Sequence, residues 1–521
     1  MAPNAAVVRA VQVACAVLVR SSADSDLHTA PAATLYWSAI RSTLAVGLAV
    51  AATLACRQAV RAAGPPNVVL IVIDDMGYGD LPSFGNADPV DMPALSSLAA
   101  AGIQFRQFYA SSPLCSPSRV GVLTGQYPSR WRINSYLSSR AENKLRDTAD
   151  FLSLQAPTLA RAFGRHGYAT AHFGKWHLGG GRDVGDAPLP TAYGFEESFT
   201  QFEGLGDRAL IRGQGLARAS AKLGQGQITW VDSKNENSAL YVDKAIDFID
   251  RHRDRPFYMN LWPEDVHDPY DPRPELAAKY AERGIDDPAL RDYYATMEGL
   301  DRELGRLFAA IDDAGLAERT VVVVMSDNGP TAAGVYYDAA SGDDEAPGST
   351  GGLRGRKSSL YEGGIRSPLV VRWKGRIPAG KVNRTTVVAA TDLYPSLLAM
   401  AGVDAAAEPR LDGVDLSERL LGDSERPRET ALYWDYGRNR HHIRPFLPVD
   451  RSPNLAMRKG DLKLLLNADG THMELYDLGV DPKESTNLVA QHPDIAEAMS
   501  RELLAWREAQ PSEPAAREDA P

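Results

Sequence analysis

The chain has 521 residues, of which 44% are hydrophobic and 24% charged, a balance typical of soluble globular proteins with a large core. Its net charge of −11 argues against a nucleic-acid partner, because such proteins carry a basic stripe or domain. An anionic substrate is not excluded, since a few cations focused in a cleft can bind one on an acidic protein.

The first 65 residues resemble a targeting segment rather than a folded domain. Residues 42–55, STLAVGLAVAATLA, form an uncharged run that is too short to span a bilayer but matches a signal-peptide core. The run ends at Cys56 in TLAC, which resembles a bacterial lipoprotein cleavage site. We expect an exported protein that is periplasmic or extracellular. We expect membrane attachment only through a lipid anchor at Cys56. A disordered Ala-rich tail is the alternative.

Residues 66–420 are predicted to form the main, catalytic domain. The run NVVLIVI is too uniformly apolar for a half-exposed strand and indicates a buried strand of a parallel sheet, followed by Asp74 and Asp75. A second such run, TVVVVMS, is followed by Asp327 and Asn328. Helical patterns lie between the strands, at residues 94–102, 158–167, 239–252 and 292–314. This order predicts an α/β fold with a mostly parallel central sheet sandwiched by helices.

Two glycine-rich stretches, residues 204–226 and 338–355, lack an apolar period and are predicted to be surface loops near a site. From about residue 421 the pattern changes to short alternating strands, as in ETALYWDY, LAMRKGDLKLLLN and HMELYDL, and then to an amphipathic helix. We therefore predict a small antiparallel C-terminal domain over residues 421–510 and a disordered tail over 511–521.

The segment LCSPSRVGVLTG contains the only cysteine after the targeting segment, Cys115. Pro117 has the fixed φ suited to a first helical turn, so Cys115 is predicted at a helix N-terminus, where free N–H groups favour an anion. Arg119 would project back toward it. With Cys15 and Cys56 in the first 65 residues, no internal disulfide is expected.

Four further segments carry polar side chains suited to chemistry. In GYATAHFGKWHLGG, Lys175 and His177 are two residues apart, which places both on one face of an extended segment. At the strand ends, Asp74, Asp75, Asp327 and Asn328 offer only oxygen atoms, which suit calcium or magnesium rather than zinc. In isolation such acids are as often helix caps or turn formers.

The last two candidates are His267 in LWPEDVHDPYDP and Lys357 in LRGRKSSLYEGGIRSP. Asp268 follows His267, so a simple surface ion pair is the alternative for the histidine. Arg354 and Arg356 lie close to Lys357 in sequence, which leaves open which of the three cations points inward.

These five separated segments, which match in the family's order, resemble the type I, formylglycine-dependent sulfatases of the alkaline-phosphatase-like superfamily. Arylsulfatases and N-acetylgalactosamine-6-sulfatases are examples of that family. The resemblance extends over roughly residues 66 to 490 and implies an alkaline-phosphatase-like fold. It also implies that a formylglycine-generating enzyme oxidises Cys115. One Ca2+, or alternatively Mg2+, would then be bound by Asp74, Asp75, Cys115, Asp327 and Asn328.

The resemblance assigns the roles as well. Substrate sulfate would be held by Lys175, His267 and Lys357, and the catalytic residues would be Cys115, Arg119, His177, His267 and Asp327. His267 would protonate the departing alcohol and His177 would help to release sulfate. The expected substrates are sulfate monoesters, most of all those of sulfated carbohydrates, and Trp434, His441 and His442 are candidates for the outer pocket.

Two other functions stay open on the sequence. A phosphonate or phosphate ester hydrolase of the same superfamily is one, although its two-zinc members resemble each other through a Ser or Thr nucleophile and several His ligands. The other is a non-catalytic binder of sulfated glycans, which this chain would become if Cys115 were never oxidised.

Overall fold

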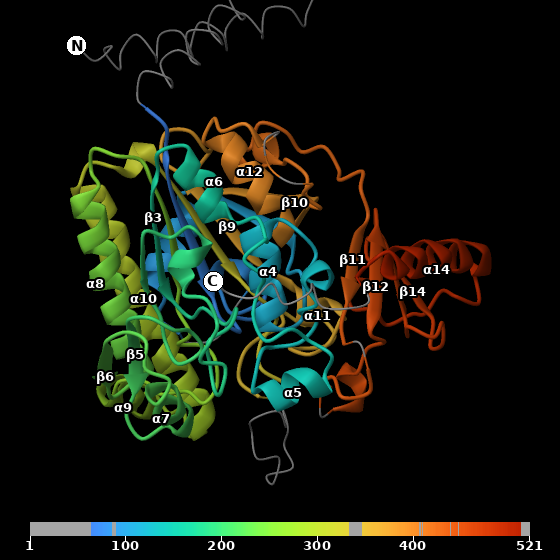
Figure 1. Ribbon diagram of the computed structural model, residues 1–521. Coiled ribbons are helices and arrows are strands. Elements are labelled where there is room, and N and C mark those ends of the chain that lie inside the picture. Colours follow the sequence, from blue (N-terminus) through green and yellow to red (C-terminus); the bar gives the residue numbers. More distant parts are fainter. Residues whose placement is uncertain are drawn as a thin grey trace, which may run out of the picture. The chain divides into compact units, whose positions relative to one another are not determined.

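The computed structural model describes residues 64–85, 90–332, 346–405, 408, 410–437, 439–445 and 447–511 (Figure 1). The predicted signal segment at residues 42–55, Cys56 and the predicted tail lie outside these ranges. None of the helices in these ranges combines the length and the apolar character needed to cross a bilayer.

An eight-stranded sheet forms the centre of the fold, in the order β10-β2-β9-β8-β1-β7-β3-β4. Strand β9 runs antiparallel to both of its neighbours, and the other neighbouring pairs are parallel. The predicted α/β class is therefore confirmed. The strands are β1 (Asn67–Ile73), β2 (Ile103–Tyr109), β3 (Ala169–Gly174), β4 (Glu197–Phe199), β7 (Phe257–Trp262), β8 (Thr320–Ser326), β9 (Arg366–Trp373) and β10 (Lys381–Ala389).

Helices cover both faces of this sheet, with α8 and α10 on one side and α4, α6 and α12 on the other (Figure 1). Strand β1 shows why its sequence is apolar throughout. Val68, Leu70 and Val72 pack into the core of one face, whereas Val69 and Ile71 pack into the core of the other.

The helices lie close to their predicted positions, and α8 begins at Lys234, five residues before the predicted start at 239. The Ser233 side chain caps it by accepting a hydrogen bond from the Glu236 N–H. The helices are α3 (Pro93–Ala100), α4 (Cys115–Thr124), α5 (Arg140–Leu145), α6 (Leu159–Arg165), α7 (Gly215–Ala221), α8 (Lys234–Arg251), α9 (Pro274–Glu282), α10 (Pro288–Asp313), α11 (Glu362–Ile365), α12 (Leu393–Met400), α13 (Ser417–Leu420) and α14 (Pro493–Glu508).

The prediction of a surface loop over residues 204–226 was wrong. The segment contains β5 (Arg208–Ile211), which pairs in parallel with β6 (Ile228–Val231), and also helix α7. The fully buried Arg208 side chain donates hydrogen bonds to the carbonyls of Gly206, Ser220 and Gly224. Because a buried guanidinium organises this segment, the sequence shows no apolar period there.

A second, antiparallel sheet of four strands has the order β11-β12-β13-β14 and is packed against α14, as predicted for residues 421–510. The predicted strand LAMRKGDLKLLLN is a hairpin of two strands, β12 and β13. The strands are β11 (Leu432–Asp435), β12 (Leu455–Lys459), β13 (Leu462–Leu466) and β14 (Glu474–Asp477).

The two sheets share a core, in which Leu432 and Trp434 of β11 pack with Tyr109 and Leu114 from the large sheet's side. Trp434 is 3% exposed, and its indole N–H donates a hydrogen bond to the Ala110 carbonyl at 2.8 Å. The expectation that Trp434 lines the outer pocket was therefore wrong.

A buried ionic cluster reinforces this junction. The Lys463 Nζ of β13 lies 3.0 Å from Glu362 Oε1 of α11 and 2.8 Å from Glu484 Oε1, and all three side chains are fully buried. Burial alone would raise the pKa of Glu362, but the charge of Lys463 lowers it to about 2. The lysine, together with Arg366, thus allows a carboxylate of the large sheet's side to stay ionised in the junction.

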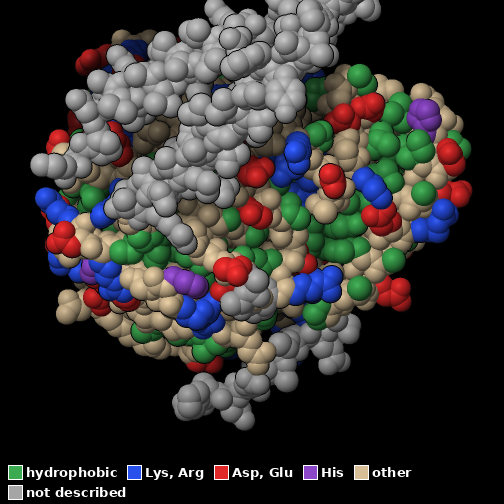
Figure 2. Space-filling view, turned by 90° about the horizontal axis from the view of Figure 1, so that it is seen from above, with side chains coloured by type: hydrophobic (Ala, Val, Ile, Leu, Met, Phe, Trp, Pro, Cys, Tyr) green, Lys and Arg blue, Asp and Glu red, His purple; other side chains and the backbone are tan. Residues whose placement is uncertain are grey.

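On the surface, the charges of the described residues are mixed in sign over the face seen in Figure 2, where acidic and basic side chains are interspersed. No single-sign field covers the visible described part of that face. A cluster of buried charged side chains lies at the carboxyl ends of the strands, inside the molecule.

Candidate active site

Four polar side chains meet where β1 and β8 end. The strands are in parallel register, with Ile73 opposite Ser326, so the residues that follow them are brought together. Carboxylate oxygens of Asp74, Asp75 and Asp327 lie within 4.8 Å of one another. The sequence had predicted this meeting, because ligand sites in open α/β sheets form beyond the carboxyl ends of the strands.

Three cations balance these carboxylates. Arg119 lies 3.0 Å from Asp74 and 2.8 Å from Asp327, and the Lys175 Nζ lies 2.7 Å from Asp74. Burial alone would raise the pKa of Asp74, but Lys175 and Arg119 hold it well below its usual range. Burial and the neighbouring Asp74 charge raise the pKa of Asp327 to about 8. With Lys357, three buried cations therefore face three buried carboxylates.

The donor set of this cluster fits a hard divalent cation. Asn328 donates a 2.7 Å hydrogen bond from Nδ2 to Asp75 Oδ1, while its buried Oδ1 has no hydrogen-bond partner among the described residues. A buried amide oxygen beside three carboxylates is the kind of ligand that calcium and magnesium take, whereas zinc recruits nitrogen or sulfur. A cation here would also offset the cost of ionising Asp327.

Cys115 is the first residue of α4, as predicted from Pro117, and follows an extended Leu114. Its side chain is buried, and Sγ lies 3.9 Å from Asp75 Oδ1. Burial raises the pKa of the Cys115 thiol well above its usual range, so the unmodified thiol is a poor nucleophile. An oxygen on residue 115 would lie beside the carboxylates, so the position fits formylglycine.

Lys175 and His177 follow β3 and line the same pocket, but for a reason other than the predicted one. His177 has φ +53°, in the left-handed region, so the segment is not extended at this residue. Its Nε2 donates a hydrogen bond to the Leu137 carbonyl at 2.9 Å, which leaves Nδ1 without the proton in the neutral ring. Burial lowers the pKa of His177 to about 3, so the ring is neutral at physiological pH.

Glu203 is a functional candidate that the sequence did not reveal. Its carboxylate lies 3.2 Å from Lys175 Nζ, 3.2 Å from His177 Nδ1 and 3.3 Å from the Arg182 guanidinium. The side chain is buried and lines the pocket. No local pattern marks it, because its partners come from the loop after β3 and reach it only through the fold.

His267 lies inside the pocket, 3.7 Å from Asp75 Oδ2 through Nε2, with Nδ1 3.4 Å from Asp268 Oδ1. It is thus no simple surface ion pair, although Asp268 does contact it. Its ring is oriented by a hydrogen bond that Nδ1 donates to the Asp268 carbonyl, and Lys234 donates a hydrogen bond to the His267 backbone carbonyl.

Lys357 is the inward cation of its segment, because its Nζ lies 2.5 Å from Asp75 Oδ2. Arg356 instead donates hydrogen bonds to backbone carbonyls, among them that of Thr331, and Arg354 donates to the Tyr476 hydroxyl. The structure thereby resolves the choice among the three cations.

These residues line a cavity of about 150 Å³. Of the strand-end cluster, Asp74 lines the cavity beside Cys115, and the cavity walls come from several loops. The wall residues include Tyr136, Arg182, Gln201, Phe202, Gln214, Leu216 and Ile443. The volume is below the roughly 300–1,000 Å³ of pockets for drug-sized ligands, so the cavity admits a small terminal group.

The same fold occurs in solved structures. The structure titled Ps i-CgsB in complex with k-i-k-neocarrahexaose matches with a TM-score of 0.69 at 23% identity, over 86% of this chain and 94% of that one. The match shows a shared α/β fold, and at the carboxyl edge of its mostly parallel sheet this chain carries a helix-terminal cysteine, a carboxylate cluster and buried cations.

Sequence comparison gives the family. The sulfatase family model matches residues 66–403, and the model for the C-terminal part of N-sulphoglucosamine sulphohydrolase matches residues 356–509. Bovine (Bos taurus) arylsulfatase A is 31% identical over 85% of this chain and 87% of its own length. N-acetylgalactosamine-6-O-sulfatase of Bacteroides thetaiotaomicron is 28% identical over 84% and 92%. The chain belongs to the sulfatase family and is a sulfuric ester hydrolase.

Proposed function

We propose that this enzyme removes sulfate from sulfated carbohydrates, using formylglycine made from Cys115 and one calcium ion. The observation that carries the proposal is the place of Cys115, at the first turn of α4 and 3.9 Å from Asp75. Sugar substrates are supported by relatives that include an N-acetylgalactosamine-6-O-sulfatase and a fold neighbour solved with a carrageenan oligosaccharide.

The residues that would hold the ion are Asp74, Asp75, Asp327 and Asn328, together with residue 115. Formylglycine supplies a nucleophilic oxygen that Cys115 lacks, and a hard divalent ion supplies Lewis-acid polarisation. The protein's own contribution is to keep this edge of the sheet dry and charge-balanced, so that electrostatic attractions there are strong.

Sulfate binding falls to the buried cations. Lys175 and Lys357 both line the pocket and would exchange part of their contact with Asp74 and Asp75 for the sulfate oxygens. Arg119 is fully buried between Asp74 and Asp327 and keeps the two carboxylates in place below the nucleophile. Because these cations are preorganised by ion pairs, little reorganisation is needed when the anion arrives.

Proton transfer falls to the two histidines. His267 lies at the pocket wall with Nε2 facing the cluster, and we assign it to protonate the departing sugar oxygen. His177 would take up a proton at Nδ1 during sulfate release. The Glu203 carboxylate, 3.2 Å from that nitrogen, would stabilise the charged ring, so Glu203 is a positioning residue for His177.

The test is the mass of the peptide containing Cys115, combined with turnover of an aryl sulfate. We expect residue 115 to be oxidised to formylglycine, and we expect the enzyme to hydrolyse both 4-nitrophenyl sulfate and a sulfated sugar. An unmodified cysteine in an inactive protein that still binds sulfated sugar would instead identify a glycan-binding protein. Faster turnover of a phenylphosphonate ester than of the matched sulfate would identify a phosphonate hydrolase.

We also propose that the enzyme acts outside the cytoplasm, on the basis of the signal-like run at residues 42–55. Cell fractionation and N-terminal sequencing test this. A mature protein beginning near Cys56 is expected, and a cytoplasmic protein that retains the run would contradict the proposal.

A further inference from the structure

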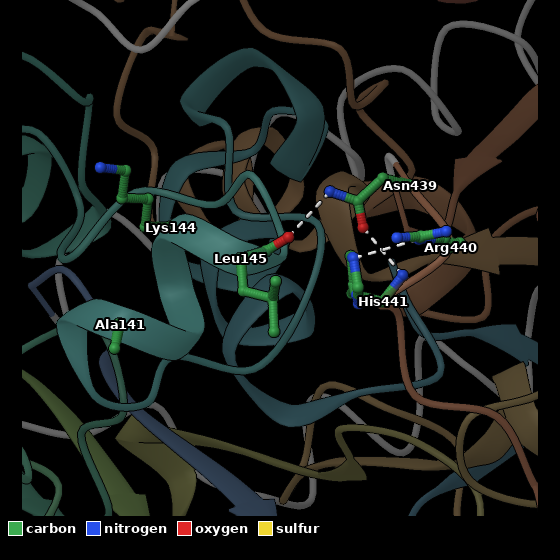
Figure 3. A pocket seen from close by; sticks show the side chains of 6 residues that line it. All are labelled: Ala141, Lys144, Leu145, Asn439, Arg440 and His441. Carbon is green, nitrogen blue, oxygen red and sulfur yellow. Dashed lines mark hydrogen bonds between the residues drawn. The ribbon is translucent and has the colours of Figure 1, made fainter.

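A second hollow lies beside the active-site pocket, and Figure 3 shows its lining. It is an open depression of about 750 Å³ and is therefore much larger than the cavity above Cys115. Helix α5 forms one side and the segment 439–441 forms the other. The lining residues are Ala141, Lys144, Leu145, Asn439, Arg440 and His441.

Hydrogen bonds hold the two sides together (Figure 3). Asn439 donates from Nδ2 to the Leu145 carbonyl at 2.9 Å and so satisfies the C-terminal end of α5. Its Oδ1 accepts a hydrogen bond from the His441 N–H at 2.9 Å, and Arg440 Nε donates to His441 Nε2 at 3.3 Å. The depression is thus a built feature rather than a gap between independent loops.

The depression is basic, although the chain as a whole carries a charge of −11. Lys144, Arg440 and His441 are exposed, no acidic residue is among the lining residues, and Lys144 forms no ion pair with another described residue. The closest acid on α5, Glu142, pairs with Arg146. The field inside the depression therefore favours an anion.

The lining also carries an apolar surface. Leu145 is 52% exposed and lines the depression together with Ala141. Apolar carbon beside cations suits a sugar ring that carries a sulfate or carboxylate, because the ring's C–H faces pack on the former while the anionic group meets the latter. A purely inorganic anion would make no favourable contact with the exposed leucine.

Residues close in sequence link the linings of the depression and the active-site pocket, although no residue lines both. Ile443, two residues beyond His441, lines the pocket, as does Tyr136. Arg146, the residue after Leu145, lies over the Tyr136 ring at 4.2 Å. Because the pocket admits only a small terminal group, the rest of a longer substrate lies outside it, where the depression is within reach of the pocket's Tyr136 and Ile443 side.

We propose that the depression binds a second anionic sugar unit of the substrate chain, at a distance from the sulfate being removed. The proposal rests on the proposed function for the presence of a sugar substrate. The cations here act on affinity and selection of longer chains, and the chemistry of sulfate removal does not depend on them.

The experiment measures binding directly, so that its outcome is independent of turnover. Titration calorimetry of the full chain at low salt uses an oligomeric dextran sulfate as one probe and an oligogalacturonate as the other. The variant Lys144→Ala/Arg440→Ala should bind at least one probe roughly tenfold more weakly than the wild type. Its turnover of 4-nitrophenyl sulfate should stay unchanged, because that ester fits inside the pocket.

The control removes the same number of charges elsewhere. Lys459 and Arg501 are exposed residues that line neither hollow, and Lys459→Ala/Arg501→Ala should bind both probes like the wild type. Equal weakening in the control would show a general charge effect and overturn the proposal. So would unchanged binding in the first variant, or no binding of either probe by the wild type. Loss of all sulfatase activity, by contrast, would count against the proposed function alone.

Discussion

The active-site pocket and the outer depression use basic side chains in opposite ways. In the pocket, Arg119, Lys175 and Lys357 are buried and each lies within 3.0 Å of a carboxylate. In the depression, Lys144 and Arg440 are exposed, and no acid is among the lining residues. Removal of an inner cation leaves a buried carboxylate uncompensated, whereas removal of an outer one costs little stability. We therefore expect changes of the inner charges to affect both catalysis and stability, and changes of the outer charges to affect affinity alone.

The largest effect is expected at the centre of the pocket. Cys115→Ala should lower turnover by roughly 10⁴-fold or more, because the residue that becomes the nucleophile is lost. The fold should persist, since only a small side chain is removed at a helix start. Turnover of 4-nitrophenyl sulfate and thermal unfolding measure the two parts. Measurable multiple turnover by this variant would rule out the assignment of the nucleophile.

The second-largest loss of activity should follow removal of the metal. Chelator-treated enzyme should lose most of its activity and regain it with calcium, with magnesium as a weaker substitute, because the strand-end residues offer oxygen ligands. Zinc should not restore activity. The measurement is turnover after dialysis against each metal, with untreated enzyme as the control, and restoration by zinc alone would show that the ligand set has been misassigned.

The assignment of His267 can be separated from general damage to the pocket by a pair of substrates. A sugar alkoxide is a far poorer leaving group than nitrophenolate, so it needs a proton in the transition state. His267→Ala should therefore lose roughly a hundredfold or more on a sulfated sugar and much less on 4-nitrophenyl sulfate.

His442 supplies the control, because it packs on Tyr436 and does not line the pocket. His442→Ala should leave the ratio of the two activities unchanged. Equal losses on both substrates for His267→Ala would remove it from the acid role and make Lys357 the next candidate.

A smaller and uniform effect is expected at Glu203. Glu203→Gln removes the charge that faces His177 Nδ1, so kcat should fall roughly tenfold and by the same factor on both substrates, because the alcohol has already left. Glu203→Asp keeps the charge and should recover part of the loss. A fall in kcat for the sugar alone would mean that Glu203 contacts the sugar instead.

The smallest effect concerns salt. Raising the salt concentration should increase the KM for a long sulfated chain, and this increase should be a few-fold larger than the increase in the KM for 4-nitrophenyl sulfate. The reason is that salt screens exposed charges much more than buried ones. In Lys144→Ala/Arg440→Ala this difference should disappear. If the KM for 4-nitrophenyl sulfate and the KM for the long chain responded equally to salt, the proposed difference between the pocket and the depression would be contradicted.

The sequence predicted the fold class and the strand-end cluster because both depend on local patterns. Apolar runs followed directly by Asp74 and Asp75, or by Asp327 and Asn328, mark strands and their carboxyl ends together. The start of α4 at Cys115 was likewise local, since Pro117 fixes it. Each of these features is encoded within about ten residues.

What the sequence could not predict depends on contacts between distant segments. Glu203 acquires its role only when the loop after β3 folds against it, and the segment 204–226 is organised by a buried arginine rather than by apolar residues. Among the aromatic candidates for the outer pocket, His441 lines the depression, but Trp434 is drawn into the core shared by the two sheets. His442 does not line either hollow.

The buried Lys463 between Glu362 and Glu484 limits how such an enzyme can be rebuilt by exchanging segments. A chimera that took everything from β11 onward from a relative without this cation would leave Glu362 with Arg366, at 3.4 Å, as its remaining ion-pair partner in the junction, at a cost of up to about 3–5 kcal/mol. That is a large part of the roughly 5–15 kcal/mol that holds a typical domain together. Because Glu362 belongs to α11, the loss of stability would reach the large sheet's side and not only the grafted part. New substrate preferences are thus more accessible through point changes at residues 439–441 than through recombination of the C-terminal segment.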